Sequence, residues 1–475
     1  MQTVRQPSLL QVGLLAGVII LMIIVMTQYT PLPIQLALLG AWFATLGLGK
    51  WLGRSYESMQ NGLLTGISQG MEAILVLIAV GALIGSWMAG GIVPSIIYYG
   101  LSVMTPQIFL FAAFFICAVT SLATGTSFGT IGTAGIAMMG IGEGFGLPAP
   151  LVAGAAISGA YVGDKLSPLS DTTVMTASLC RVDLIEHIKS MLYISVPAIV
   201  IASALFLFTG ILTGHQGSTG RATEVMAVID AWFTVSPFMI LPALAVITLL
   251  ILRQPAVPVI FFGALLGVVW AVLFQQQDVI PALETLYGGS HIESDDNVIA
   301  VLLNRGGMVS MLPNILLIIL ALGIGGLMEA TGVLATITTS LQRWADNVTK
   351  LGLSTLLAGI IGNILGGAAY VSLITASTIT GKNYDATGTD RRVLSRNAES
   401  GGTVVTPMIP WSDGGVFMAT TLGVSTAAYL PYLWYHLLVL GIAVLYSFTG
   451  WFHFNNAIRP ARTFTNEQKT TRSQS

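Results

Sequence analysis

Apolar residues run along this chain in stretches of about twenty positions, the length that an α-helix needs to cross a bilayer. The strands of a membrane β-barrel would instead alternate apolar and polar positions. The pattern therefore predicts an all-α polytopic membrane protein with roughly 10–12 transmembrane segments. The clearest apolar runs lie at residues 9–27, 34–52, 71–93, 106–123, 191–213, 236–252, 257–274, 312–329, 351–370 and 430–448.

The composition agrees with this pattern. Hydrophobic residues make up 54% of the chain, charged residues only 8%, and the mean hydropathy is +0.82. An ordinary soluble domain has about a quarter charged residues, so composition excludes a soluble protein. The net charge of −2 gives no sign of a nucleic-acid partner, and Cys117 and Cys180 fit no metal-ligand spacing. The lipid bilayer is the expected partner of most of the surface.

A polar segment at residues 163–173 interrupts the apolar pattern with the charged side chains of Asp164, Lys165 and Asp171. The hydroxyls beside them belong to Ser167, Ser170, Thr172 and Thr173. Charge at membrane depth costs at least about 2.5–3.5 kcal/mol per residue, and Pro168 prevents a continuous helix. We predict a cation- or proton-binding site on an unwound segment, with a short polar loop at the membrane surface as the alternative.

Two further segments have the same character. Residues 400–413 contain Thr403, Ser412 and Asp413, again next to a proline. Thr126 and Ser127 lie in a segment of poor helix propensity, residues 124–133. This segment predicts either a broken helix whose freed carbonyls coordinate a cation, or a small-residue packing face between two helices.

The two halves of the chain resemble each other. A shift of 242 residues brings Ser170 and Asp171 onto Ser412 and Asp413. The flanking charges predict opposite directions through the membrane, hence two inverted repeats with discontinuous or re-entrant segments, which are typical of secondary transporters. We expect, in order, an N-terminal helical pair, a first repeat, a linker with two helices and an acidic external loop, a second repeat and a cytoplasmic tail, at 1–60, 61–214, 215–305, 306–452 and 453–475.

The positions of Lys and Arg predict the topology. Lys50 and Arg54 place the N-terminal side in the cytoplasm, and the basic residues after position 453 place the C-terminus there too. The acidic loop at 275–305 is expected outside. Inverted repeats then put the connection at 382–396 outside as well, against its basic character.

The predicted chemistry is competition between sodium ions and protons. Sodium prefers several hard oxygens, and a buried carboxylate, hydroxyls and freed carbonyls supply them. A buried carboxylate favours its protonated form, whereas a bound cation favours its charged form. We expect Asp171 and Asp413 to bind Na⁺, with Asp164 titrating beside them. Supporting positions are expected at Lys165, Glu399 and Glu72. No cofactor is expected, and the sequence has no Gly-x-x-x-x-Gly-Lys-Ser/Thr nucleotide motif.

The run from Gly159 to Thr173, Gly-Ala-Tyr-Val-Gly-Asp-Lys-Leu-Ser-Pro-Leu-Ser-Asp-Thr-Thr, resembles the signature of the NhaC family of bacterial sodium/proton antiporters. Residues 394–411 are similar to the second-half pattern of that family, although Ser412 and Asp413 follow Trp411 where an asparagine is expected. The resemblance implies a secondary active antiporter, not an enzyme, that exchanges sodium for protons by alternating access across the bacterial inner membrane. A homodimer is compatible with it.

The same family includes exchangers that couple malate, protons, sodium and lactate. The resemblance therefore leaves an organic-acid exchanger as the alternative, with a small dicarboxylate or monocarboxylate as a further partner. A carboxylate substrate needs a cationic or amide-rich partner near the membrane midplane, and Lys165 is the candidate in the first motif.

Overall fold

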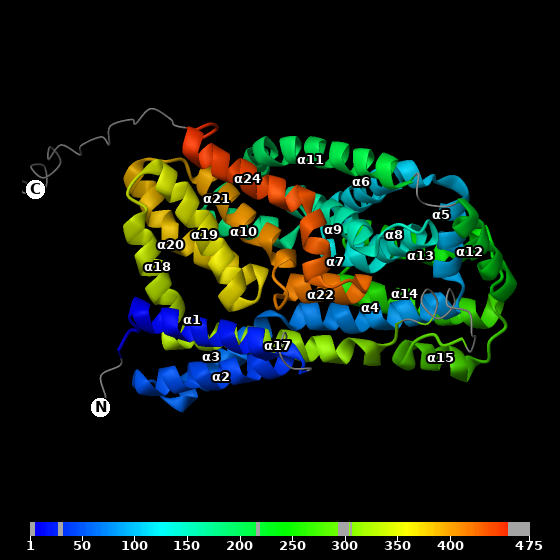
Figure 1. Ribbon diagram of the computed structural model, residues 1–475, viewed down its shortest axis with the longest axis horizontal. Helices are drawn as coiled ribbons and strands as arrows, with labels where there is room; N and C mark the ends of the chain where they lie inside the picture. Colours follow the sequence, from blue (N-terminus) through cyan, green and yellow to red (C-terminus); the bar gives the residue numbers. More distant parts are fainter. Residues whose placement is uncertain (1–4, 27–31, 215–218, 293–303, 305, 455–475) are drawn as a thin grey trace, which may run out of the picture.

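The computed structural model describes residues 5–26, 32–214, 219–292, 304 and 306–454, and every regular element over these residues is a helix. The longest helices run roughly along the long axis of an elongated body (Figure 1). The predicted all-α architecture is confirmed. The predicted cytoplasmic tail, with Arg459 and Lys469, and most of the predicted acidic loop, with Asp295 and Asp296, lie outside the described residues.

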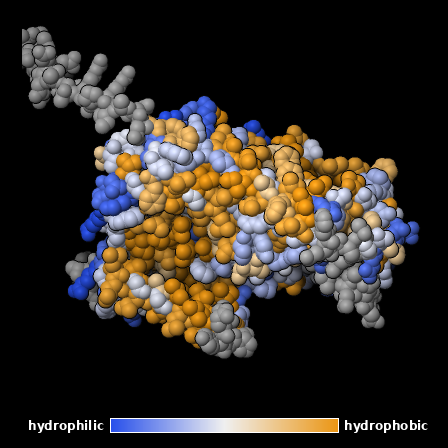
Figure 2. Space-filling model, turned by 45° about the horizontal axis from the view of Figure 1, so that its top comes forward, coloured by the Kyte–Doolittle hydropathy of each residue, from blue (hydrophilic) through white to orange (hydrophobic). Residues whose placement is uncertain are grey.

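Six helices of the described chain are long and apolar enough to cross a membrane, and two bent helix pairs raise the number to eight if each pair is one span. The six are α4 (Met71–Ala89), α6 (Pro106–Thr124), α11 (Leu184–Gly214), α14 (Ala256–Phe274), α17 (Met308–Thr331) and α19 (Val348–Gly366). The bent pairs are α12 (Thr219–Trp232) with η3 (Pro237–Ile240) and α13 (Leu241–Ile251), and α23 (Thr426–Tyr429) and η5 (Leu430–Tyr432) with α24 (Trp434–Thr449). Large apolar side chains cover much of the outer surface, as expected where it faces lipid (Figure 2).

Helices α2 (Ile34–Trp51) and α3 (Tyr56–Gln69) pack on α17 at the N-terminal end of the body, and α1 (Leu9–Ile24) packs on α2 (Figure 1). The indole N–H of Trp42 on α2 donates to the carbonyl of Leu320 on α17 at 2.6 Å. Gly66 lets α3 approach α17 closely, because a Cβ built there would lie 2.4 Å from the Leu322 carbonyl oxygen. Sequence analysis did not predict α3, since its polar positions give no continuous apolar run.

Two hairpins occupy opposite halves of the body and turn near its centre (Figure 1). The first runs along α6, turns at Gly125 and returns as α7 (Ser127–Thr130), the π-helix η2 (Ile131–Gly135) and α8 (Ile136–Gly144). The second runs along α19, turns at Gly367 and returns as α20 (Ala369–Thr387). Both glycines have left-handed backbones, with φ of 74° and 70°, which residues with a Cβ rarely adopt. The sequence predicted the break in the first hairpin but not the one at Gly367.

Each half also contains a broken helix that passes the hairpin tip. In the first half, α9 (Ala149–Leu166) stops at the Ser-Pro-Leu-Ser segment and the chain continues as α10 (Asp171–Cys180). In the second half, α21 (Arg391–Gly401) and the 3₁₀ segment η4 (Thr403–Met408) precede α22 (Asp413–Leu422). The interruptions predicted at both polar motifs are confirmed.

Local backbone features recur at the spacing found in the sequence. Left-handed residues lie 242 positions apart at Gly125 and Gly367, Gly146 and Gly388, and Arg181 and Gly423. A hydrogen bond recurs at the same spacing: Ser121 Oγ donates to the Ala160 carbonyl at 2.5 Å, and Asn363 Nδ2 donates to the Gly402 carbonyl at 2.7 Å. The two halves therefore follow similar backbone paths.

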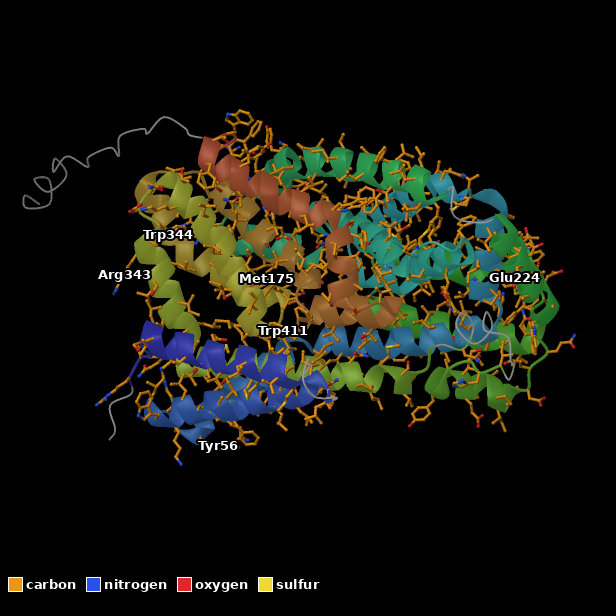
Figure 3. The ribbon with its side chains drawn as sticks, viewed as in Figure 1. Tyr56, Met175, Glu224, Arg343, Trp344 and Trp411 are labelled. Carbon is orange, nitrogen blue, oxygen red and sulfur yellow. The ribbon has the colours of Figure 1, made fainter. Side chains whose placement is uncertain are left out.

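The described N- and C-terminal residues lie at the same end of the body (Figure 1). The connection from α20 to α21 lies there too, because Asn383 Nδ2 donates to the carbonyl of Ala345 just after α18 (Val333–Trp344). Arg391 pairs with Asp385 at 2.6 Å in this connection and lowers the pKa of that carboxyl. Arg343 and Glu224 mark the two opposite ends in Figure 3.

This placement corrects the expectation that residues 382–396 and the N-terminal side face opposite sides of the membrane. The expectation was wrong because it treated residues 351–370 as one complete crossing. The chain instead turns at Gly367 and returns along α20 to the end from which it came. At the other end, α5 (Ile92–Val103) and α15 (Val279–Gly288) complete the helices (Figure 1).

Candidate cation site

The two hairpin tips and the two broken helices enclose a cavity of about 100 Å³ at the centre of the molecule. Four carboxylates line it, those of Glu72, Asp164, Asp171 and Asp413. Hydroxyls line it too, from Thr126, Ser127, Thr172, Thr403, Thr406, Tyr161 and Tyr370. The structure thus brings residues 163–173 and 403–413 together, as the sequence predicted. No Lys or Arg is among the described residues that line this cavity.

Asp164, near the end of α9, has the cavity carboxylate that accepts the most side-chain hydrogen bonds. Ser127 Oγ donates to its Oδ2 at 2.7 Å, and Ser170 Oγ donates to its Oδ1 at 2.6 Å. Hydrogen bonds to a charged group contribute about 1.5–3 kcal/mol each, which offsets part of the cost of burying the charge. Ser127 lines the cavity, so its hydroxyl keeps its lone pairs for a cation there, whereas Ser170 supports the Asp164 carboxylate from outside the lining.

Asp171 and Glu72 lie at the more open side of the cavity, and both side chains are exposed. Asp171 is the first residue of α10, where the positive end of the helix dipole favours a carboxylate. Thr172 follows it, and its hydroxyl lies 3.0 Å from that of Ser170. This chain of contacts connects the exposed side of the cavity with Asp164.

Asp413 begins α22 in the second half and is buried. The backbone N–H of Gly414 donates to its Oδ1 at 2.6 Å. Ser412, by contrast, caps the helix: its Oγ accepts from the N–H of Gly415 at 3.0 Å and donates to the Thr406 carbonyl at 2.5 Å. Ser412 does not line the cavity, although the sequence placed it among the cation-binding residues.

Two hydroxyls of the first motif also hold the backbone. Ser167 Oγ donates to the Leu122 carbonyl at 3.0 Å and accepts from the N–H of Leu169 at 3.2 Å. Thr173 Oγ1 donates to the carbonyl of Asp164 at 2.9 Å. Neither lines the cavity, so the structure gives both residues a role in shaping the unwound segment.

Lys165 and Glu399 lie off the cavity, and both are fully buried. Lys165 Nζ donates to Ser400 Oγ at 2.8 Å. Glu399 Oε2 accepts from the hydroxyl of Thr176. Thr403, four residues after Glu399 in the chain, lines the cavity, and its hydroxyl has no hydrogen-bond partner among the described residues.

Sequence analysis missed several polar groups at the site. Tyr161, Tyr370 and Thr406 line the cavity, and Asn363 Oδ1 accepts from Thr406 Oγ1 at 3.0 Å. Asn363 also holds the Gly402 carbonyl, as described above. The signal for Asn363 was present: it stands 242 residues after Ser121, as an amide inside an apolar run.

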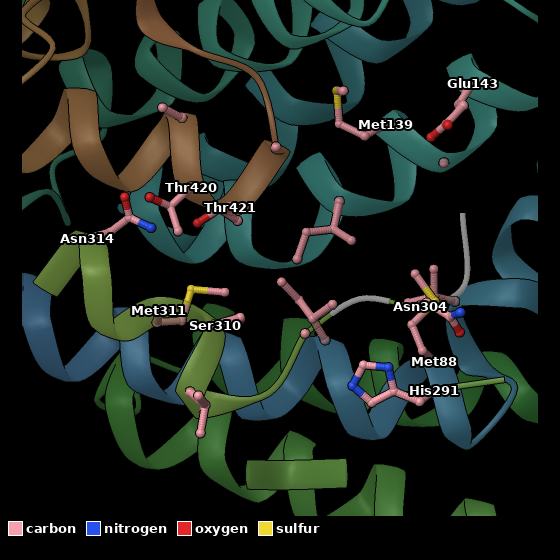
Figure 4. Close-up of a pocket in the computed structure, with 18 of the residues that line it drawn as sticks. Met88, Met139, Glu143, His291, Asn304, Ser310, Met311, Asn314, Thr420 and Thr421 are labelled. Atoms are coloured by element: carbon pink, nitrogen blue, oxygen red, sulfur yellow. The ribbon is translucent and has the colours of Figure 1, made fainter. Parts of the chain in front are cut away.

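A second and wider cavity, of about 750 Å³, lies towards the end that carries Glu224. Amide and hydroxyl groups of Asn314, Thr420 and Thr421 gather at one side of it, and Glu143, His291 and Asn304 at the other (Figure 4). Asn304 is occupied with the backbone, since it both donates to and accepts from Ile292.

A thin apolar layer separates the two cavities. On α22, Asp413 lines the small cavity and Thr421 the wide one, and Phe417 lies between them on the same helix face. Phe417 is buried and stacks on Phe128 of α7, with ring centroids 4.3 Å apart. On α4, the buried Val80 occupies the equivalent middle position.

The chemistry of the small cavity suits monovalent cations and protons. Its carboxylates occupy different walls, and no three Asp, Glu, His or Cys side chains of the described chain converge enough to hold a metal ion by themselves. Hydroxyls and freed carbonyls at the helix breaks would have to complete the coordination of a cation. Fold and site together are those of a polytopic membrane protein with a buried acidic cavity.

The comparison with known proteins gives the family. A sequence model described as the Na⁺/H⁺ antiporter family matches residues 2–180 and 159–451. The chain belongs to this family of secondary transporters, and to its NhaC type.

Relatives cover almost the whole chain. The malate-2H⁺/Na⁺-lactate antiporter of Bacillus subtilis is 48% identical over 463 residues, which are 97% of this chain and 99% of that protein. The Na⁺/H⁺ antiporter NhaC of Alkalihalophilus pseudofirmus is 34% identical over 93% of this chain and 95% of its own. Among solved structures, MtrF of Neisseria gonorrhoeae, from a class of antimetabolite efflux pumps, aligns over 93% of this chain and 95% of its own with a TM-score of 0.37 and 14% identity.

Proposed function

We propose that this protein is an antiporter that couples sodium ions and protons to the exchange of small organic acids of the malate and lactate type. The observation that carries the proposal is the 48% identity, over nearly the full length of both chains, to an antiporter named for malate, protons, sodium and lactate. It favours the organic-acid alternative of the sequence analysis over simple sodium/proton exchange.

In this proposal the small cavity is the cation site. Asp164, with the hydroxyls of Ser127 and Ser170 already directed at it, binds Na⁺ or a proton, and Asp413 contributes the second buried carboxylate. Asp171 and Glu72 attract cations at the exposed side. A charged carboxylate that is shielded from water and has no partner is high in free energy. Release of sodium therefore favours uptake of a proton by the same carboxylate.

The acidic residues that line the cavity explain why transport of the organic acid would require bound sodium ions or protons. An organic anion approaching Asp164, Asp171 and Asp413 is repelled unless cations or protons neutralise them first. The cavity has no basic residue among the described lining residues to do so. Occupation by sodium or protons therefore precedes entry of the acid.

We also propose an orientation in the bacterial inner membrane. Several arginines lie at the end that holds both described termini. Arg54 lies two residues after Leu52, whose carbonyl accepts from the Arg5 N–H, and Arg391, next to Arg392 at the start of α21, donates to the carbonyl of Cys180, which precedes Arg181. By the positive-inside rule this end is cytoplasmic. The small cavity is then open to the cytoplasm past the exposed Asp171, while the Phe128–Phe417 layer closes it towards the wide cavity.

Simple sodium/proton antiport is the second candidate. The small volume of the cavity, about 100 Å³, and its acidic lining favour cations over an organic acid. The 34% identical relative is named a Na⁺/H⁺ antiporter.

Transport in proteoliposomes tests both candidates. Purified protein is reconstituted, and malate uptake and internal pH are followed with sodium, lactate, both or neither inside. We expect malate uptake that needs internal sodium together with lactate and that is strongly reduced in Asp164→Asn vesicles at a sodium concentration that half-saturates the wild type. Proton flux driven by sodium alone, with no stimulation by either acid, would reject the organic-acid proposal in favour of the second candidate.

A further inference from the structure

The wide cavity contains polar side chains that take no part in the cation site. Asn314 of α17 and Thr420 and Thr421 of α22 gather at one side of it (Figure 4). The two helices pack against each other, so these side chains meet at one helix–helix interface. Asn314 interrupts an otherwise apolar stretch of α17, where a polar residue is costly unless it has a partner.

The three polar groups are not satisfied within the part of the chain that the structure describes. Thr421 is 7% exposed, and its Oγ1 has no hydrogen-bond partner there. Asn314 and Thr420 are half-buried and make no side-chain hydrogen bond with another described residue, so the three do not bond one another. Ser310 differs, because its hydroxyl donates to the Gly307 carbonyl at 2.7 Å. A buried hydroxyl without a partner is costly, and the group therefore points to a ligand in this cavity.

The size and lining of the wide cavity suit a small organic molecule. Its volume of about 750 Å³ lies within the roughly 300–1,000 Å³ of small-molecule pockets, whereas the cation cavity of about 100 Å³ lies well below that range. Apolar side chains of Ile84, Met88 and Met139 line the wide cavity beside the polar group. An apolar pocket with a few convergent polar groups is typical of sites that bind small ligands.

The polar group fits a carboxylate better than a cation. Asn314 has an amide with two N–H donors, and each threonine has a hydroxyl hydrogen, which a carboxylate can accept. A hard cation prefers carboxylate oxygens close around it, but the one carboxylate among the described lining residues, Glu143, lies on the opposite side (Figure 4). The dipoles of α17, which begins at the cavity, and of α22, which ends there, oppose each other and favour neither sign of charge.

The polar group lies directly beyond the aromatic layer. Asp413, Phe417 and Thr421 follow one another at intervals of four residues on one face of α22. Thr421 is therefore about 12 Å along the helix from Asp413, with Phe417 halfway between them. At this distance a cation in the small cavity attracts an anion in the wide one, so each ligand increases the affinity for the other.

We propose that Asn314, Thr420 and Thr421 form a subsite in the wide cavity that binds a carboxylate of the organic acid. The proposal rests on the proposed function, which takes small acids of the malate and lactate type as substrates. The amide and the two hydroxyls donate to the carboxylate, and the apolar lining contacts the hydrocarbon part of the acid. The acid stays bound there, next to the aromatic layer, until sodium ions or protons occupy the small cavity.

Equilibrium dialysis of purified protein in detergent tests the subsite, because both ends of the solubilised protein are accessible. Binding of ¹⁴C-malate is measured at saturating sodium, and binding of ²²Na⁺ without malate. We expect Thr421→Val and Asn314→Leu each to raise the Kd for malate at least about 10-fold, since each removes a donor to a charged group. The Kd for sodium should stay within about 2-fold of wild type.

Thr331→Val is the matched control. Thr331 is buried on α17 as well, but it does not line the cavity, and its hydroxyl donates to the Leu327 carbonyl at 2.8 Å. This variant should change neither Kd by more than about 2-fold. An unchanged malate Kd in both subsite variants would overturn the proposal, and so would a weaker sodium Kd with malate binding unchanged. If the wild-type protein binds neither malate nor lactate, the proposed function itself fails, which is a different result.

A labelling experiment replaces any variant that does not fold. Ser310 lines the cavity one turn before Asn314, and the two native cysteines, Cys117 and Cys180, are buried. In Ser310→Cys, malate at ten times its Kd should slow modification of the new thiol by a small methanethiosulfonate about 10-fold. A modification rate that malate does not change would contradict the subsite.

Discussion

The two broken segments at the centre of this transporter follow similar paths but differ in local helix type and in chemistry. The first, at residues 163–173, carries a carboxylate held by two side-chain hydroxyls, together with a buried lysine. At the matching positions 242 residues later, Asp164 and Lys165 are replaced by Thr406 and Pro407. Asp171 and Asp413 match in both type and position, yet one is exposed and the other buried. The two halves therefore follow similar paths, while three of the four carboxylates that line the cavity, those of Glu72, Asp164 and Asp171, lie in the first half.

The largest difference in sodium affinity is expected between variants of Asp164 and variants of its counterpart Thr406. Asp164→Asn should raise the sodium concentration for half-maximal transport about 100-fold, because a charged ligand worth about 3 kcal/mol is lost. Thr406→Val removes an uncharged hydroxyl that donates to Asn363 Oδ1 or the Gly402 carbonyl, and it should change the half-maximal sodium concentration by no more than about 3-fold. Sodium titrations of transport in proteoliposomes measure both. Similar effects of the two variants on the half-maximal sodium concentration would show that the two halves contribute equally to sodium binding.

The next comparison pairs Asp413 with Asp171. Asp413 is 5% exposed, so its attraction for a cation acts in a poorly screened environment, whereas water and salt weaken that of Asp171. We expect Asp413→Asn to raise the half-saturating sodium concentration about 10-fold and Asp171→Asn about 3-fold. Only the second effect should shrink between low and high ionic strength, with choline chloride as the added salt. A larger, salt-independent effect of Asp171 would place it inside the coordination shell.

The hairpin turns offer a comparison of stability. Alanine at Gly125 or Gly367 costs about 1–2 kcal/mol for the left-handed backbone. At Gly125 the new Cβ would also lie 2.6 Å from Leu169 Cβ, whereas at Gly367 the nearest atom is 3.4 Å away. Gly125→Ala should therefore be worse by about 1–3 kcal/mol of overpacking. The apparent melting temperature of each variant in detergent, with Gly441→Ala as a control in open space, measures the difference.

The smallest effect, a change in stability, is expected for substitutions at the C-terminal ends of α10 and α22. Arg181 adopts the left-handed conformation, with φ of 55°, that Gly423 adopts in the other half. Arg181→Gly should stabilise the protein by up to about 1 kcal/mol, since it removes the strain of a side chain in that conformation. Gly423→Ala should have the opposite sign. A lower melting temperature for Arg181→Gly would mean that contacts of the arginine outweigh the strain.

The sequence predicted the location of the candidate cation site better than the structural role of each side chain in it. Charge and hydroxyls in an apolar chain identified both broken segments, and the 242-residue spacing predicted that they meet. The uses of Ser167, Thr173 and Ser412 could not be predicted, because a hydroxyl at a helix break can face a ligand or cap the backbone with the same sequence. Lys165 illustrates a further limit: it adjoins Asp164 in the chain but points to Ser400 instead of the cavity.

The fold was predicted where crossings are continuous and missed where they are partial. Apolar runs located α4, α6, α11, α14 and α17, whose lengths match a bilayer. The turn at Gly367 left no polar mark in the sequence, since Ala368 and Ala369 follow it where Thr126 and Ser127 follow Gly125. Because this turn was missed, the connection at 382–396 was predicted at the wrong end of the molecule. The repeat boundaries at 61–214 and 306–452 stay a prediction.

The aromatic layer between the two cavities has an electrical consequence. On α22 the layer lies between Asp413, which lines the small cavity, and Thr421, which lines the wide one, so the apolar barrier between the two cavities extends over about 12 Å of helix. A membrane voltage falls mainly across the insulator and not across water-filled space. An ion that passes this one layer therefore does nearly all of its electrical work there, about 2.3 kcal/mol per elementary charge at 100 mV.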